Sequence, residues 1–298
     1  MQHLFIINKT AGKNDSYLQV TKQLDKLNIE NCTVKYTQAK GDATNIARDF
    51  VKNSHDFVNV YSCGGDGTFN EVVNGIYDLD NCAVAPVPIG SGNDFIRSFQ
   101  TKKEDFLNID KLLKGTAKSV DLIKCNDKIC ANSVNIGFDC AVAKNVDIFK
   151  KWPLISSSFA YKLSVVYCLV SKRKHNFEIY ADNKLLPMKS TYLLSVSAKG
   201  KYYGGGIKCA PYADNMDGLI DFMFIDSVGI IKFLSFFTSF VKGEHINDST
   251  ADFVFHNKYN QIEYKSKTPI EIGVDGEIFT VTEAKISVLK NALKIILP

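Results

Sequence analysis

Residues 63–75 read Cys-Gly-Gly-Asp-Gly-Thr-Phe-Asn-Glu-Val-Val-Asn-Gly, and they combine a strand end, a glycine-rich turn, one carboxylate and a helix start. The run before them, residues 57–61, has the pattern of a buried strand, and the glycines let a ligand approach the backbone closely. Thr68 with Glu71 three residues later fits a capping box, which predicts a helix that begins at Thr68. The free N–H groups of a helix start favour an anion. The stretch therefore predicts a phosphate-binding junction, with a plain strand-to-helix turn as the alternative.

Asp66 is the unexpected member of this junction, because a carboxylate repels a phosphate unless Mg²⁺ or a donated hydrogen lies between them. A second glycine loop at residues 88–95, Pro-Ile-Gly-Ser-Gly-Asn-Asp-Phe, also follows a predicted strand and adds Asp94. It lacks the third glycine of a dinucleotide-binding motif, and the chain has no Walker P-loop. On one sheet, both loops would line one crevice, where Asp66 and Asp94 could share a Mg²⁺ ion.

The spacing of apolar residues predicts two kinds of architecture along the chain. Up to about residue 121, strands at 4–7, 33–36, 57–61 and 83–87 alternate with helices at 17–27, 43–52, from 68, and at 103–113, which favours a parallel sheet covered by helices on both faces. Short β-rich runs follow at 129–136, 177–181, 192–198, 219–225, 261–264 and 270–273, and they predict a mainly antiparallel second domain. Helical stretches interrupt them at 154–170 and 228–241. The latter is interpreted as a core-packed helix, with a membrane-touching helix as the alternative.

The composition is that of an ordinary globular protein with room for two domains. The chain has 298 residues, of which 45% are hydrophobic and 23% charged. A net charge of +4 is too small to indicate a nucleic-acid partner, and the basic cluster at 172–175 is interpreted as a solvated loop rather than a contact with an anionic surface. The eight cysteines include no CxxC pair and are expected to be reduced thiols. No apolar run is long enough for a signal peptide or a membrane span, so a cytoplasmic protein is expected.

Three weaker motifs remain open between a site and an ordinary turn. Residues 8–13 form a small polar turn with two lysines after the first predicted strand. Residues 272–277, Ile-Gly-Val-Asp-Gly-Glu, fit an Asp-Gly hairpin turn. Residues 214–219, Asp-Asn-Met-Asp-Gly-Leu, place two carboxylates three positions apart, which would suit either a hard cation or another Asp-Gly turn.

Taken together, GGDGTFNEVVNG, PIGSGNDFIRS and VDGE, in this order and spacing, resemble the diacylglycerol kinase catalytic-domain family, specifically its small bacterial lipid kinases. The resemblance spans the entire chain. It implies a doubly wound α/β ATP-binding domain at 1–121 and 285–298, similar to that of NAD kinases and diacylglycerol kinases, with an inserted antiparallel β-sandwich-like domain at 122–284. It also implies ATP- and Mg²⁺-dependent phosphoryl transfer to a lipid alcohol, with diacylglycerol as the expected acceptor. A lipid substrate at the membrane surface, peripheral contact with the inner face of the membrane and a homodimer are further expectations.

The resemblance also assigns roles to individual residues. Glu277 would be the general base, and Asp66, Asp94 and Asp121 would form a network of carboxylates, water and Mg²⁺. A structural Mg²⁺ would bind Asp214, Asp217 and Leu219, the first and last through backbone oxygens. Thr37 enters because residues 37–43 match the family's T-x-x-x-G-D-A pattern. The residues implied to bind ATP are Asn8, Lys9, Thr10, Ala11, Gly12, Thr37, Gly64, Gly65, Asp66, Gly67, Thr68, Phe69, Asn70 and Ser91. The family usually has serine where this chain has Ala11, so one hydroxyl contact is lost there.

Two other functions are weighed against this one. A soluble-metabolite kinase such as NAD kinase also uses GGDG, but the threonine-rich segment expected for holding a dinucleotide is missing, and the second glycine loop fits the lipid kinases better. A non-catalytic nucleotide or lipid sensor would have little need for Asp66, Asp94 and Glu277 together.

Overall fold

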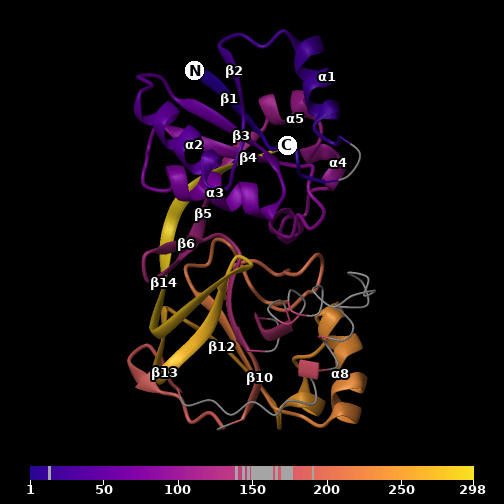
Figure 1. Ribbon diagram of the computed structural model, residues 1–298, viewed down its shortest axis with the longest axis vertical. Helices are drawn as coiled ribbons and strands as arrows, with labels where there is room; N and C mark the ends of the chain where they lie inside the picture. Colours follow the sequence, from indigo (N-terminus) through magenta and orange to yellow (C-terminus); the bar gives the residue numbers. More distant parts are fainter. Residues whose placement is uncertain are drawn as a thin grey trace.

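The computed structural model describes residues 1–12, 15–137, 140–142, 177–189 and 191–298, with the single residues 145, 148, 164, 167 and 168. The two domains lie end to end along the long axis, and β5 and β14 pass between them (Figure 1). The fold class expected from the sequence, an α/β domain followed by a β-sandwich-like domain, is confirmed. The helical stretch expected at 154–170 and the basic cluster at 172–175 fall largely or wholly outside the described residues.

The first domain is built on a parallel sheet in the order β4-β3-β1-β2. Its strands are β1 (Gln2–Ile7), β2 (Cys32–Tyr36), β3 (Val58–Gly64) and β4 (Cys82–Pro88). Every residue of β3 and β4 is buried, as expected of parallel strands with both faces covered. Because the strands are parallel, their carboxyl ends, where the glycine loops begin, lie at one edge of the sheet.

Helices cover this sheet. They are α1 (Leu18–Leu27), α2 (Asp42–Lys52), α3 (Asp66–Ile76), α4 (Lys103–Phe106) and α5 (Ile109–Leu113). The single helix expected at 103–113 is wrong, because Asn108 takes an extended conformation and its side chain accepts a hydrogen bond from the N–H of Lys111. Gln23 of α1 holds this break by donating to the carbonyl of Leu107 and accepting from the N–H of Ile109.

The second domain is mainly antiparallel, with neighbouring strands in the order β12-β11-β10-β7-β13-β14. Its strands are β6 (Lys128–Cys130), β7 (Ser133–Gly137), β8 (Phe177–Ala181), β9 (Lys184–Leu185), β10 (Tyr192–Ala198), β11 (Ile220–Asp226), β12 (Val254–Tyr259) and β13 (Gln261–Val274). The strand expected at 129–136 is interrupted at 131–132. The two runs expected at 261–264 and 270–273 instead form one strand, β13, with an irregularity between Lys265 and Ile270.

Two strands belong to both domains. The first half of β14 (Glu277–Leu297) pairs with β13, and its far end pairs with β4. β5 (Thr116–Cys125) pairs along most of its own length with the second half of β14. Along β5, Leu122 belongs to the core of the first domain and Ile123 to the core of the second. The boundaries expected at 121 and 285 therefore fall inside continuous strands.

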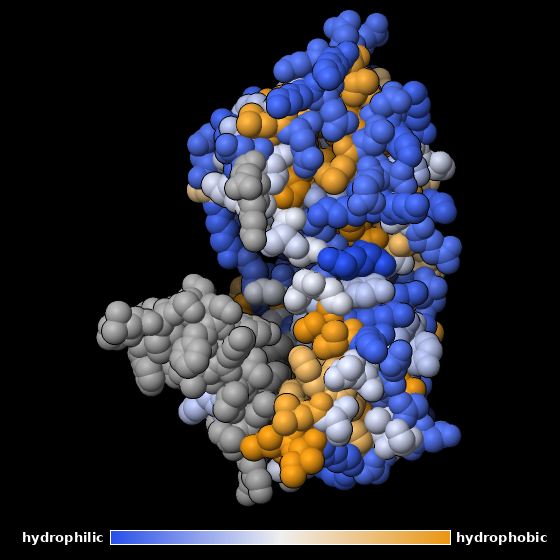
Figure 2. Space-filling view, turned by 90° about the vertical axis from the view of Figure 1, so that its right-hand side faces the viewer, coloured by the Kyte–Doolittle hydropathy of each residue, from blue (hydrophilic) through white to orange (hydrophobic). Residues whose placement is uncertain are grey.

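Helix α8 (Ile230–Lys242) matches the stretch expected at 228–241 but is not packed over its whole apolar face. Phe233, Phe236 and Phe240 are buried, whereas Ile231 is 87% and Leu234 is 62% exposed. Hydrophobic side chains gather at the lower end of the face in Figure 2, where α8 lies. Among the described residues, no helix is long and apolar enough to cross a membrane. The eight cysteines are free thiols as expected, and all but Cys32 are buried.

Candidate active site

The two glycine loops touch each other at the carboxyl edge of the first sheet. The N–H of Gly90 donates to the carbonyl of Gly64 at 3.0 Å. A methyl group on Gly90 would lie only 2.3 Å from the Cα of Gly65, so only glycine allows this approach. Gly12 of the first turn is packed equally closely against the carbonyl of Ile89. Three segments that are distant in the sequence thus form one backbone cradle.

Helix α3 begins two residues earlier than expected. Gly65 is its extended N-cap residue and Asp66 its first residue, so the capping box expected at Thr68 and Glu71 is wrong. The Oγ1 of Thr68 instead accepts from the Nδ2 of Asn8 at 3.1 Å, which ties the first turn to α3. Glu71 accepts from the N–H of Ala43, so its carboxylate caps the neighbouring helix α2. The earlier start aims the free N–H groups of α3 at the glycine loops.

The carboxylates of Asp66 and Asp94 both lie close to Gly92. The Oδ1 of Asp66 accepts from the N–H of Asp94 at 2.7 Å, and its Oδ2 would lie 2.7 Å from a methyl group on Gly92. Asp94 is 5% exposed, and its Oδ2 accepts from the N–H of Gly205 at 2.7 Å. Its Oδ1 accepts no hydrogen bond from the part of the chain that the structure describes, although Arg97 Nε is 3.5 Å away. Burial raises the pKa of Asp94, and the charge of Asp66 adds to this effect.

The loop that donates to Asp94 was missed by the sequence reasoning. Gly204, Gly205 and Gly206 have φ values of +63°, +83° and +119°, which only glycine adopts readily. The available signal was the run of three glycines in a β-rich region, because a loop with positive φ at three successive positions needs glycine at each of them.

Asp275 joins the second domain to helix α3. Its carboxylate accepts from the backbone N–H groups of Ala131, Asn132 and Ser133 at 2.7–3.0 Å, and from the Nδ2 of Asn70 at 2.6 Å. Burial raises the pKa of Asp275, although hydrogen bonds from the Sγ of Cys130 and from the three backbone N–H groups oppose that effect. The three donors explain the interruption between β6 and β7. The turn at 272–277, which left a hairpin as one interpretation, is therefore also an anchor between the domains.

Glu277 follows this turn and is the first residue of β14. Its carboxylate forms an ion pair with Lys40, and both side chains are substantially exposed. Its neighbours Gly276 and Ile278 line the cleft, but Glu277 does not. Thr37 is not among the lining residues either, and its N–H donates to the carbonyl of Ile7.

A cavity of about 1370 Å³ extends from the glycine loops into the second domain. Its polar end is lined by Asn8, Thr10, Ala11, Gly12, Gly65, Asp66, Gly67, Thr68, Phe69, Ser91 and Asp94, which include most of the residues expected to bind ATP. Lys9, Gly64 and Asn70 are not among the lining residues; Lys9 lies over the ring of Tyr36. The other end is apolar, and α8 supplies four phenylalanines to it: Phe233, Phe236, Phe237 and Phe240. Such a cavity suits a ligand with an anionic head and an apolar body.

Two family models match this chain. The diacylglycerol kinase catalytic domain matches residues 2–125, and the YegS C-terminal NAD kinase beta sandwich-like domain matches residues 132–297. The chain belongs to the diacylglycerol kinase catalytic-domain family. It is a lipid kinase of the diacylglycerol kinase type, which confirms the resemblance seen in its motifs.

Relatives of this lipid kinase match it over nearly its whole length. A diacylglycerol kinase of Bacillus subtilis strain 168 is 28% identical, over 98% of this chain and 95% of its own. A diacylglycerol kinase of Staphylococcus haemolyticus is 26% identical, over 98% of this chain and 87% of its own. In fold, the chain is similar to a crystal structure of a diacylglycerol kinase from Bacillus anthracis strain Sterne, with a TM-score of 0.74 over 100% of this chain and 97% of that one, at 24% identity.

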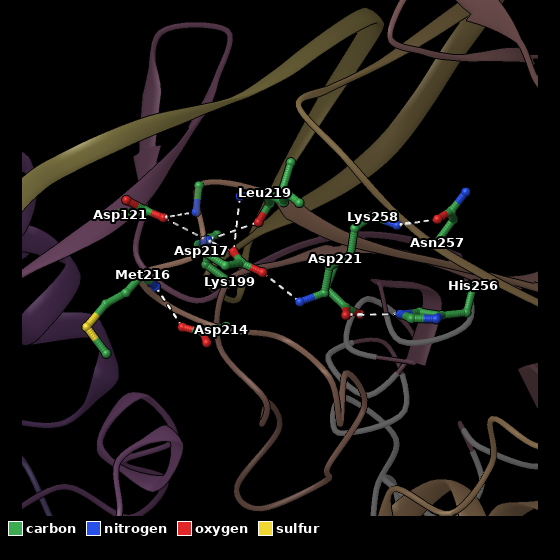
Figure 3. Close-up of polar contacts among 11 residues, drawn as sticks. Asp121, Lys199, Asp214, Met216, Asp217, Leu219, Asp221, His256, Asn257 and Lys258 are labelled. Carbon is green, nitrogen blue, oxygen red and sulfur yellow. Dashed lines mark hydrogen bonds and ion pairs between the residues drawn. The ribbon is translucent and has the colours of Figure 1, made fainter.

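Asp121 lies in a separate cluster in this lipid kinase, not in the cleft with Asp66 and Asp94 (Figure 3). Its Oδ2 accepts from the Nζ of Lys199 at 2.9 Å and from the N–H of Gly218 at 2.7 Å, and its Oδ1 accepts from the N–H of Asn291. Asp217 and Leu219 belong to the same cluster, whereas the exposed Asp214 accepts from the nearby N–H of Met216. Within the described ranges, no group of three or more histidine, cysteine or acidic side chains is placed to hold a metal ion.

Proposed function

We propose that this lipid kinase transfers the γ-phosphoryl group of ATP to the hydroxyl of diacylglycerol, giving phosphatidic acid, with Mg²⁺ as the cofactor. The observation that carries the proposal is the continuity of the cavity. One end is a cradle of backbone N–H groups at a helix start, and the other is a wall of phenylalanines from α8. A soluble metabolite would gain little from that wall, whereas acyl chains would bury their surface against it.

The polar end supports binding of a nucleotide triphosphate. Gly65 and Gly67 bring the backbone close to the cleft without side chains, and the first N–H groups of α3 have no partner within the helix. Such groups stabilise charge that spreads over phosphate oxygens in a transition state. The tie between Asn8 and Thr68 fixes the first turn against α3, which positions the cradle before the nucleotide arrives.

The residues beside this cradle fit Mg²⁺. Asp94 keeps one oxygen without a hydrogen bond in the described part of the chain, and oxygens of both Asp66 and Asp94 lie close to Gly92. Carboxylate oxygens are the ligands that Mg²⁺ prefers. When bound, the ion would neutralise negative charge on the phosphate oxygens. Asp66 and Asp94 are therefore the residues that we propose to hold it.

Glu277 is proposed as the base that accepts the proton of the lipid hydroxyl. Its position beside Gly276 and Ile278 puts it at the rim of the cleft. Its pair with Lys40 is exposed, and exposed pairs are held weakly, so the carboxylate can exchange Lys40 for a hydroxyl when the acceptor is bound. Because phosphoryl-transfer transition states are often loose, the main effect of Glu277 would be to orient that hydroxyl.

The acceptor resides in a bilayer, so we propose peripheral contact between this kinase and a membrane. The exposed Ile231 and Leu234 of α8 adjoin the apolar end of the cavity, since Phe233 and Phe237 of the same helix line it. Contact through α8 would shorten the path of a lipid from the bilayer into the cleft.

The test is a phosphorylation assay with radiolabelled ATP and the full-length protein. Vesicles containing diacylglycerol should yield labelled phosphatidic acid, and EDTA should abolish the product. Vesicles containing the same lipid with its hydroxyl acetylated are the matched control and should give none. Labelled NADP from NAD, or ATP binding without a phosphorylated product across a panel of lipid alcohols, would overturn the proposal.

A further inference from the structure

Lys199 is a fully buried lysine whose ammonium group is completely satisfied. It is 0% exposed, and its Nζ lies 2.9 Å from the Oδ2 of Asp121, 2.8 Å from the Oδ1 of Asp217 and 2.9 Å from the carbonyl of Leu219. An ammonium group has three protons and no acceptor, so three acceptors use it completely. Buried lysines are rare and need such partners, because an unpaired buried charge is very costly.

The three acceptors come from two parts of the fold that are far apart in the sequence. Asp121 is on β5, while Asp217 and Leu219 precede β11 in the turn at 214–219 (Figure 3). Lys199 itself follows β10, and its N–H donates to the carbonyl of Asn132. Asp121 reaches further, to the N–H of Asn291 in β14. The ammonium therefore lies where strands of both domains meet.

Two of these acceptors, Asp217 and Leu219, belong to the structural Mg²⁺ site expected at Asp214, Asp217 and Leu219. The oxygens of Asp217 and Leu219 are suitable ligands in kind, but the Nζ of Lys199 already occupies the space among them. The second oxygen of Asp217 pairs with Lys258 at 2.6 Å. Two carboxylates thus face two lysines, and their charges cancel. A divalent cation does not fit this donor set.

We propose that Lys199 is a built-in cation that replaces a structural divalent ion at Asp121, Asp217 and Leu219, so that the junction of the two domains is held without metal. Burial tends to raise the pKa of Asp217, but the hydrogen bonds from Lys199 and Lys258 outweigh it and hold the pKa below its usual value.

The test uses thermal melting of the full-length protein without nucleotide or lipid, in MgCl₂, in CaCl₂ and in EDTA. The wild type should melt at the same temperature in all three. Lys199→Ser removes the ammonium and leaves the carboxylates of Asp121 and Asp217 together, so its Tm should fall by roughly 5–8 °C in EDTA. Mg²⁺ or Ca²⁺ should restore much of that loss, because the emptied space is lined by oxygens. A variant whose protein melts like the wild type, or does not respond to either ion, would contradict the proposal.

Lys258→Met is the matched control, because it removes the partly exposed partner of the same Asp217 and keeps Lys199. It should melt close to the wild type and show no response to metal. If Lys199→Ser does not fold, crystals of the wild type soaked in MnCl₂ decide the question. Anomalous density between Asp121 and Asp217 would overturn the proposal, and its absence there would support it. Neither measurement depends on catalysis, so failure here would leave the proposed kinase activity untouched.

Discussion

Gly90 and Gly67 belong to the same cradle but have opposite surroundings. A methyl group on Gly90 meets the backbone of Gly65 at 2.3 Å, whereas one on Gly67 meets nothing within 4 Å. We expect Gly90→Ala to lower the free energy of unfolding by about 3 kcal/mol, as overpacking against backbone does. Gly67→Ala should fold normally and gain up to about 1 kcal/mol, because alanine is favoured in a helix.

The two variants should differ again in nucleotide binding. Gly67 lines the polar end of the cavity, so a methyl group there would occupy space proposed for a phosphate. Gly67→Ala should therefore bind ATP weakly despite its stability. Urea denaturation and calorimetric titration with ATP measure the two effects separately. A Gly90→Ala protein as stable as the wild type, or a Gly67→Ala protein with unchanged ATP affinity, would argue against the cradle.

Glu277 forms an exposed ion pair with Lys40, so its proposed role as the base is tested best by substitution. Glu277→Gln keeps the shape of the side chain but cannot accept a proton, and we expect kcat to fall at least about 100-fold while ATP affinity is nearly unchanged. Lys40→Met is the matched control, because it breaks the same exposed pair and leaves the carboxylate. It should change the free energy of unfolding by less than about 1 kcal/mol and keep kcat within a few-fold. Near wild-type turnover in Glu277→Gln would exclude Glu277 as the base.

At the scale of helices and strands, the elements that depend on the local pattern of apolar residues were predictable. Element boundaries that depend on hydrogen bonds to distant segments were not. β3 and β4 are continuous apolar runs, and their expected positions agree closely with the structure. The start of α3 was misplaced because Thr68 and Glu71, which form a capping box in sequence, bond instead to Asn8 and Ala43 from other segments. Such long-range partners override a local signal and leave no trace in the spacing of residues.

The packing of α8 should depend on pH through His245. This histidine is fully buried, with its Nε2 3.1 Å from the carbonyl of Cys209 and its ring 4.8 Å from that of Phe240. Burial lowers its pKa to about 4 from an ordinary value of 6.5. The unfolded chain therefore binds a proton before the folded chain does, so stability is complete above about pH 6.5 and is lost as the pH falls towards 4.

The expected loss is about 2 kcal/mol between about pH 7.5 and pH 5. Urea denaturation at the two pH values measures it. His245→Gln should be less stable at neutral pH but should lack most of this pH-dependent loss. Because burial also lowers the pKa of His3, the difference between wild type and variant, rather than the wild type alone, reports on His245. Equal pH dependence in both proteins would show that His245 does not control the packing of α8.

At the scale of the whole molecule, the sequence indicated which residues could form the site but not which of them contact one another. Because ligand sites form at the carboxyl ends of parallel strands, the loops that contain Asp66 and Asp94 were expected at one edge of the sheet. In the structure both carboxylates lie close to Gly92. The pairing of Asn70 with Asp275, 205 positions apart, needed the second domain to be placed first. A single lysine such as Lys199 is ordinary in a sequence and becomes unusual only when it is buried.

The shared strands predict that the two domains unfold together. β14 runs from the β13 ladder into the parallel sheet, β5 pairs along it through both cores, and Asn70 and Lys199 add polar ties at the junction. Neither domain can unfold without breaking hydrogen bonds of β5 and β14, which the other domain shares. Differential scanning calorimetry should therefore show one transition with equal calorimetric and van't Hoff enthalpies. Its enthalpy should be about 200 kcal/mol near 60 °C. Asp275→Ala, which removes the acceptor of Asn70, should move this transition to lower temperature without splitting it. Two resolved transitions in the wild type would instead mean that the domains unfold independently.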